Sequence, residues 1–142
     1  MAEPSAPRGH ASHSHTADVI IEAWAPTASG CYEEAIAGFV AVFADTASAP
    51  AGTTLAFEVG PGGPSDLLVR LLEEVLVTVE ARFVVPTGAD VHVEGDRLTG
   101  TLTVVPAEAA ELTGPVPKGV SYSGLSFDAD NGRWRCRMTV DV

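Results

Sequence analysis

Basic residues are scarce in this chain of 142 residues. It has 8 lysine and arginine residues against 19 acidic residues, Lys118 is its only lysine, and the net charge is −11. A protein that binds nucleic acid directly usually has a basic surface that displaces counterions from the phosphates. The sequence therefore argues against direct nucleic-acid binding and favours a metal ion, a basic protein partner, or charge that serves solubility.

Long apolar runs and paired cysteines are also missing. No stretch approaches the roughly 20 apolar residues that cross a bilayer, and the polar N-terminus lacks the apolar core of a signal peptide. We therefore expect a cytoplasmic protein that does not enter a membrane. The two cysteines, Cys31 and Cys136, fit a reducing compartment as small buried residues rather than as a disulfide.

Familiar catalytic motifs are absent as well. The chain has no glycine-flanked nucleophilic serine and no His-Glu-x-x-His motif. Cys31 and His15 could act as nucleophile and base, but Cys31 falls on or beside an apolar helical stripe. The glycine-rich turn Gly60–Pro64 lacks the Lys-Ser/Thr ending of a nucleotide-binding loop. We predict that the protein is not an enzyme in its own right.

The N-terminal region differs in composition from the rest. Residues 1–14 are rich in Ala, Ser, Pro and His without a periodic apolar pattern, which predicts a flexible tail. The histidines of this region could bind a transition metal only weakly, because the segment is expected to be unstructured. Residues 15–142 are long enough for a single domain with one core.

Apolar periodicity predicts the elements of that domain. Alternation of apolar and polar residues predicts strands over 17–25 and 53–59, and nearly continuous strand from residue 82 onward. Helical spacing predicts one helix after Pro26, capped by Thr27 or Ser29, and a second capped by Ser65. We expect an α+β fold, a two-layer single domain in which two helices pack on a largely antiparallel sheet.

Two acidic residues lie at the outer ends of this pattern. Asp18 opens the first predicted strand and Asp141 closes the last. If those strands pair, the two carboxylates converge beside a backbone carbonyl, a ligand set that suits calcium or magnesium. The spacing leaves open that both are ordinary solvated acids. Asp45, which ends the first predicted helix, is a further candidate for an acidic site.

Several motifs, in order along the chain, resemble those of one family. His15-Thr16-Ala17-Asp18-Val19 is similar to the archease signature, as are Phe43-Ala44-Asp45-Thr46 and the Asp-Leu-Leu helix with Leu72-Glu73-Glu74. The stretch Lys118-Gly119-Val120-Ser121-Tyr122-Ser123 and the terminal Val140-Asp141-Val142 also resemble archease motifs. The chain departs from the family at Ala28-Ser29-Gly30, where archeases usually have Leu-Glu-Glu. Together the matches span residues 14–142.

The resemblance implies an accessory role. Archeases activate the GTP-dependent RNA ligase RtcB in tRNA splicing and RNA repair by promoting its guanylylation and turnover. It places a metal site at Asp18, Asp141 and the backbone carbonyl of Val142, with Ca²⁺ expected and Mg²⁺ or Mn²⁺ as alternatives. His15, Lys118 and Tyr122 match family motifs and become candidates for contact with the ligase, together with Asp45.

Alternatives remain for the motif residues and for the function. Lys118 could simply protect a strand edge from pairing, and Tyr122 could simply pack. The protein could instead be a calcium-binding chaperone or scaffold with several protein partners. An autonomous metal-dependent hydrolase is a further alternative.

Overall fold

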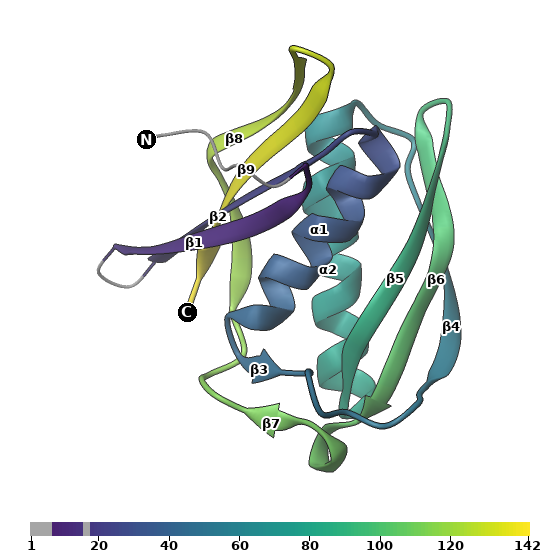
Figure 1. The fold of residues 1–142 in the computed structure, drawn as a ribbon, viewed down its shortest axis with the longest axis vertical. Coiled ribbons are helices and arrows are strands. Elements are labelled where there is room, and N and C mark those ends of the chain that lie inside the picture. Colours follow the sequence, from purple (N-terminus) through teal and green to yellow (C-terminus); the bar gives the residue numbers. More distant parts are fainter. Residues whose placement is uncertain (1–6, 16–17) are drawn as a thin grey trace.

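A computed structural model of the chain describes residues 7–15 and 18–142. Two helices and several antiparallel strands make up a single α+β domain, which confirms the predicted fold class (Figure 1). The helices are α1 (Ala28–Ala41) and α2 (Pro64–Arg82). The strands are β1 (Gly9–His15), β2 (Asp18–Ala25), β3 (Ala44–Asp45), β4 (Thr53–Val59), β5 (Val84–Glu94), β6 (Arg97–Pro106), β7 (Glu111–Leu112), β8 (Gly119–Asp130) and β9 (Arg133–Asp141), and a short 3₁₀ turn, η1 (Ala107–Ala109), precedes β7.

The described strands form three sheets rather than the single sheet that the sequence suggested. The sheet orders are β1-β2-β9-β8, β4-β6-β5 and β3-β7. Both helices lie between the two larger sheets, so that one continuous apolar core joins all three layers (Figure 1). This core fixes the faces of the strands, because apolar side chains must point toward the helices.

Helix α1 begins as the sequence predicted. The hydroxyl of Thr27 accepts a hydrogen bond from the backbone N–H of Gly30 at 3.0 Å, which caps the first turn. The predicted apolar stripe of this helix is buried. Gly38 allows α1 to approach β2 closely, because a Cβ atom there would lie 2.9 Å from the Cγ2 of Ile21.

Helix α2 differs from the prediction at both ends. It begins at Pro64 after an N-cap at Gly63, not at Ser65, because the fixed φ of proline suits the first helical position. It continues through Arg82, which we expected to open a strand, and ends at Phe83, whose φ is 54°. The apolar residues of this helix fill the space between the sheets.

The prediction of a flexible tail over residues 1–14 is wrong for residues 9–14. These residues form most of β1, which pairs with β2 from Gly9 opposite Trp24 to His15 opposite Asp18. The strand was missed because its sequence, Gly-His-Ala-Ser-His-Ser-His, lacks apolar alternation. His10 and the preceding Arg8 instead contact Glu34 of α1. The domain therefore begins before residue 15; residues 1–6 lie outside the described part.

The later strands follow the predicted order. β5 is one strand with a bulge between Pro86 and Gly88. β8 and β9 form a hairpin whose turn residues Asn131 and Gly132 have φ values of 53° and 73°. None of the helices in the described residues is long and apolar enough to cross a membrane.

Candidate metal site at the end of the four-stranded sheet

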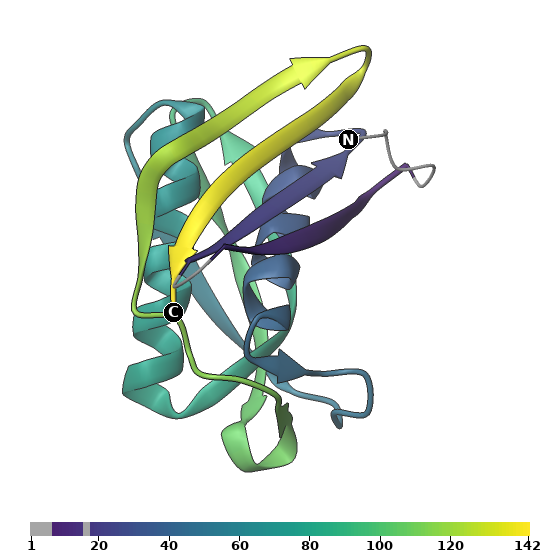
Figure 2. The ribbon, with the colours of Figure 1, turned by 90° about the vertical axis from the view of Figure 1, so that its left-hand side faces the viewer.

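Asp18 and Asp141 lie directly opposite each other at the ends of β2 and β9. The antiparallel register of these strands runs from Asp18 opposite Asp141 to Ala25 opposite Trp134. Figure 2 shows the C-terminal end of β9 beside the start of β2. Residues opposite each other on neighbouring strands have Cβ atoms about 4.5–5.5 Å apart. The two strands therefore bring the two predicted carboxylates together.

The apolar core determines which way these carboxylates face. Ile21 and Ala23 of β2, and Met138 and Val140 of β9, are buried toward the helices. Because side chains alternate along a strand, the even-numbered residues of β2 and the odd-numbered residues of β9 point outward. Asp18 and Asp141 therefore share the outer face of the sheet.

The start of β8 completes this end of the sheet. Gly119 lies opposite Asp141 in the β8–β9 ladder, and the backbone N–H of Lys118 donates a hydrogen bond to the carbonyl of Asp141 at 2.6 Å. Val142 is partly buried and packs against the core, which holds the residue after Asp141 in place. The backbone of Asp141 is thus held by β2 on one side and by the start of β8 on the other.

The electrostatics of this pair suit a divalent cation. Two carboxylates lie on neighbouring strands, and neither forms an ion pair with a basic side chain among those that the structure describes. Like charges directly opposite in a sheet are destabilising. Hard carboxylate oxygens are ligands that calcium and magnesium prefer. The donor set therefore fits the predicted ion.

The described side chains do not form a complete protein cage. They contain no group of three or more His, Cys, Asp or Glu residues arranged to hold one metal ion. Asp45 therefore does not join Asp18 and Asp141; it lies in β3, a strand of a different sheet, opposite Glu111 of β7. Two carboxylates and a carbonyl leave part of the usual six to eight calcium ligands to water or to a partner.

Tyr122 lies in an irregular part of β8 near this site. The β8–β9 register shifts between Ser121 and Ser126, where Gly124 has a φ of 68°. Tyr122 is 62% exposed, so the alternative that it simply packs is wrong. A bulge of this kind redirects side chains and often lies beside a functional site.

The backbones of Lys118 and His15 lie beside those of Asp141 and Asp18. Lys118 is exposed and precedes β8, which is an edge strand, so contact with a partner and protection of the edge both fit its place. The backbone of His15 pairs with that of Asp18. The side chain of His15 lies outside the described part.

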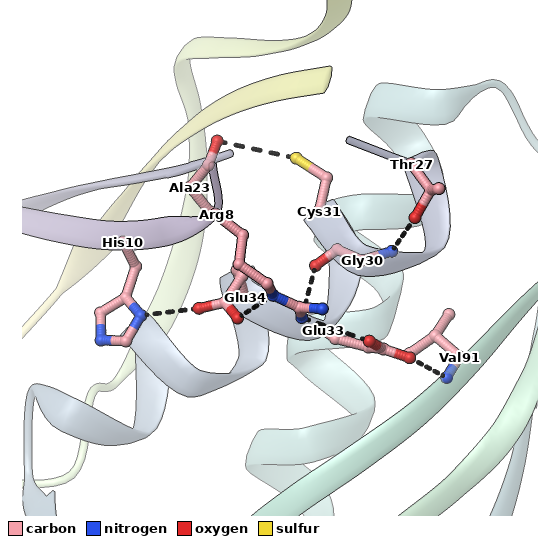
Figure 3. A network of polar contacts seen from close by, with 9 residues as sticks. All are labelled: Arg8, His10, Ala23, Thr27, Gly30, Cys31, Glu33, Glu34 and Val91. Carbon is pink, nitrogen blue, oxygen red and sulfur yellow. Dashed lines mark hydrogen bonds and ion pairs between the residues drawn. The ribbon is translucent and has the colours of Figure 1, made fainter. Parts of the chain in front are cut away.

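A charged network on α1 was missed by the sequence analysis (Figure 3). Arg8 donates to Glu34 at 2.6 Å and to Glu33 at 3.3 Å, and the ring of His10 contacts Glu34 at 3.1 Å. Burial lowers the pKa of Arg8, but the hydrogen bond and charge of Glu34 outweigh it, so the pKa is raised overall. Glu33 also accepts the backbone N–H of Val91 at 3.0 Å, which links α1 to β5. Arg8 lies just before β1, so only the pairing of β1 with β2 could have revealed this network.

The cysteines lie in the core rather than at a reactive surface. Cys31 and Cys136 are both free and are 0% and 3% exposed. Its hydrogen bond with Cys31, followed by burial, raises the pKa of the Cys136 thiol well above its ordinary value. Cys31 is therefore not placed as the surface nucleophile considered above, and no disulfide joins the pair.

The fold is that of two solved structures. The solution structure of protein 1598 from Methanobacterium thermoautotrophicum has a TM-score of 0.78 and 22% identity, covering 94% of this chain and 99% of that one. The crystal structure of an archease, described as a possible chaperone, from Thermotoga maritima has a TM-score of 0.65 and 16% identity, covering 100% and 98%. At these identities the likeness establishes the fold alone.

Sequence comparison identifies the family. The model of the archease protein family matches residues 11–142. Proteins named "Probable protein archease" from two strains of Mycobacterium tuberculosis are 36% identical over 140 residues, which is 99% of this chain and 78% of theirs. The chain therefore belongs to the archease family. The names of these relatives describe an archease rather than an enzyme.

Proposed function

We propose that this protein activates a GTP-dependent RNA ligase of the RtcB type in tRNA splicing and RNA repair. It acts in the cytoplasm as an accessory protein that promotes guanylylation and repeated turnover of the ligase, and it is not an enzyme by itself. One observation carries the proposal for this chain: the residues expected to hold the family's metal ion lie opposite each other, as Asp18 and Asp141. Membership of the archease family supports it.

The proposed role of the acidic pair is to hold one divalent cation, Ca²⁺ in the first place, with the carbonyl of Val142. A bound cation stabilises negative charge that develops during nucleotidyl transfer. The two carboxylates and the fixed chain end orient it at the rim of the sheet, where a partner can supply further ligands. Lys118, Tyr122 and His15 are the proposed contacts with the ligase around this rim.

The charge of the protein supports recognition through a protein rather than through RNA. With a net charge of −11, the chain is repelled by phosphates, so we infer that the ligase, not this protein, contacts the RNA. An acidic rim also suits insertion into a basic cleft that binds a nucleotide and RNA ends.

The test is multiple-turnover RNA ligation by the RtcB-type ligase of the source cell, with and without this protein. We expect the wild-type protein to raise turnover and Asp18→Asn or Asp141→Asn to remove the gain. Asp128→Asn, in an exposed hairpin, is the matched control and should stimulate as wild type does. Circular dichroism checks that each variant is folded. Full stimulation by both site variants would show that the carboxylates are not needed.

A calcium-binding chaperone or scaffold is the second candidate. The description of the Thermotoga maritima relative as a possible chaperone favours it. This function predicts that the protein slows aggregation of several unrelated unfolded proteins in light-scattering assays, with no effect on ligase turnover. Stimulation of the ligase together with no effect on aggregation would rule it out in favour of the first proposal.

A further inference from the structure

A groove lies along α1, on a side of the domain that the proposed metal site does not use. Its volume is about 650 Å³, and its floor is made of small and apolar residues of the helix, among them Ala37, Val40 and Ala41. One wall is the stretch Pro86–Ala89 of β5, which is an edge strand of its sheet. Ala37 and Ala41 are exposed, so the floor is open along its length.

The two ends of the groove differ in charge. At one end Arg8 and His10 satisfy the carboxylates of Glu33 and Glu34 (Figure 3). Arg8 offsets the charge of one of these two carboxylates, and the backbone N–H of Val91 donates a hydrogen bond to Glu33. This end is therefore held together by its own contacts.

The other end remains negatively charged. Asp45 lines the groove and also a neighbouring hollow of about 280 Å³, which contains Glu108 and Glu111 and no basic side chain. Asp45 lies directly opposite Glu111 in the β3–β7 ladder, an arrangement of like charges that costs stability. The fold thus maintains uncompensated negative charge where the groove ends.

Two large exposed apolar residues lie near this acidic end along the backbone. Leu112 follows Glu111 and is 58% exposed, and Phe83 is 75% exposed. The carbonyl of Phe83 accepts the backbone N–H of Ala107, so the backbone of Phe83 lies beside the residue that precedes Glu108. A surface that combines large apolar side chains with one sign of charge is typical of a binding site for a protein.

We propose that this groove binds an extended segment of a partner protein that carries apolar side chains followed or preceded by lysine or arginine. The apolar side chains cover Ala37 and Ala41, and the cationic end lies between Asp45 and Glu111. The groove runs between α1 and the Pro86–Ala89 stretch of β5, so an extended segment can lie along it. The charge of the acidic end selects a basic segment and repels nucleic acid. The proposal is independent of the metal site.

Two synthetic peptides test the proposal against the full-length protein. The first, Ac-Val-Leu-Val-Leu-Lys-Arg-amide, has the proposed chemistry, and the second replaces Lys-Arg with Glu-Glu. Each is also made in reversed order, because the direction of binding is open. We expect ¹⁵N chemical-shift changes along α1, β3 and β5 with the basic peptides and none with the acidic ones. Equal changes with both charges, or none at millimolar peptide, would overturn the proposal.

Variants separate the groove from general attraction to an acidic protein. Ala41→Arg fills the floor and Glu111→Lys reverses the charge at its end, and each should weaken binding at least about tenfold. Glu73→Lys makes the same change of charge on the exposed side of α2 and should change affinity less than about twofold. All three positions are exposed, and thermal unfolding verifies folding. Equal loss in Glu73→Lys and Glu111→Lys, or tight binding to Ala41→Arg, would contradict a site in the groove.

Discussion

This protein has two pairs of acidic residues in which one acid lies opposite the other on a neighbouring strand. The two pairs differ in the strands that carry them. Asp18 and Asp141 end two strands of eight and nine residues in the four-stranded sheet. Asp45 and Glu111 belong to strands of two residues each, which form a sheet of their own at the surface. Both arrangements oppose like charges, yet only the first is embedded in long strands with a buried inner face.

The difference indicates two kinds of recognition. The inner faces of β2 and β9 are packed against α1, so the core determines the separation of Asp18 and Asp141. A site of fixed geometry suits an ion, which needs ligands at defined distances. In the β3–β7 pair Ala44 alone is buried, whereas Asp45, Glu111 and Leu112 are exposed, so this pair has less core beneath it and suits a larger partner. The predictions below test this contrast, beginning with the largest expected effect.

Truncating an apolar side chain near each acidic pair should lower the free energy of unfolding by unequal amounts. Met138 is 0% exposed on β9, and Met138→Ala should destabilise the protein by about 2–5 kcal/mol. Leu112→Ala, at a side chain that is 58% exposed beside the second pair, should change stability by less than about 0.5 kcal/mol. Urea unfolding followed by circular dichroism measures both. Equal effects would mean that the two pairs are equally embedded.

Calcium should distinguish the pairs directly. At a concentration about 100-fold above its dissociation constant, a bound ion stabilises the folded state by about 2.7 kcal/mol, or roughly 5–10 °C in Tm. Asp18→Asn and Asp141→Asn should each remove this gain, because each deletes a ligand. Asp45→Asn and Glu111→Gln should keep it. Differential scanning calorimetry with and without Ca²⁺ gives the comparison.

The same contrast explains what could be predicted from the sequence. Long strands carry apolar alternation, so the faces of β2 and β9 followed from residue spacing. Their pairing did not, and the resemblance to archeases is what placed Asp18 and Asp141 in one site. Strands of two residues carry no period, and the pairing of Asp45 with Glu111 depends on how a loop folds back. The first pair was therefore predictable, and the second was not.

The first strand and the second helix show other limits of sequence patterns. β1 was missed because it lacks apolar alternation, and its link to α1 is made by His10 and the preceding Arg8, which contact Glu34 at 24 or more positions along the chain. Ser65 has the side chain of a good helix cap, but Pro64 already fits the first turn and moves the start of α2. In the first case a contact between distant residues, and in the second a backbone constraint, determined the structure. Neither is visible in the local pattern of side chains on which the prediction depended.

Alkaline pH should weaken the strand that holds the first pair. The pKa of Cys136 is raised by its hydrogen bond with Cys31 and by burial, so the folded state retains a proton that the unfolded chain loses. This stabilising contribution is complete below the ordinary thiol pKa of about 8.5 and falls as pH rises above it, by about 1.4 kcal/mol per pH unit between the two values.

Urea midpoints at pH 7.5 and pH 9.5 measure that decline. Cys136→Ala should be less stable at both values, because it leaves a small cavity, but its stability should fall less between them. Leu112→Ala serves as the control with an unchanged pH slope. Burial also raises the pKa of Tyr32, so a further loss is expected at still higher pH. An identical slope in wild type and Cys136→Ala would exclude this cause.

Relief of charge repulsion is the smallest expected effect and bears on both pairs at once. Without metal, Asp141→Asn and Glu111→Gln each remove one of two opposed charges, so each should raise stability by about 0.5 kcal/mol or less at low salt. High salt screens exposed charges and should abolish both gains. With added Ca²⁺, Asp141→Asn should lower stability instead of raising it, since that change also removes a ligand of the ion. Glu111→Gln should still not lower it. If Glu111→Gln also lowers stability in the presence of Ca²⁺, the second pair binds the ion too. The distinction between a fixed ion site and an adaptable docking site would then be wrong.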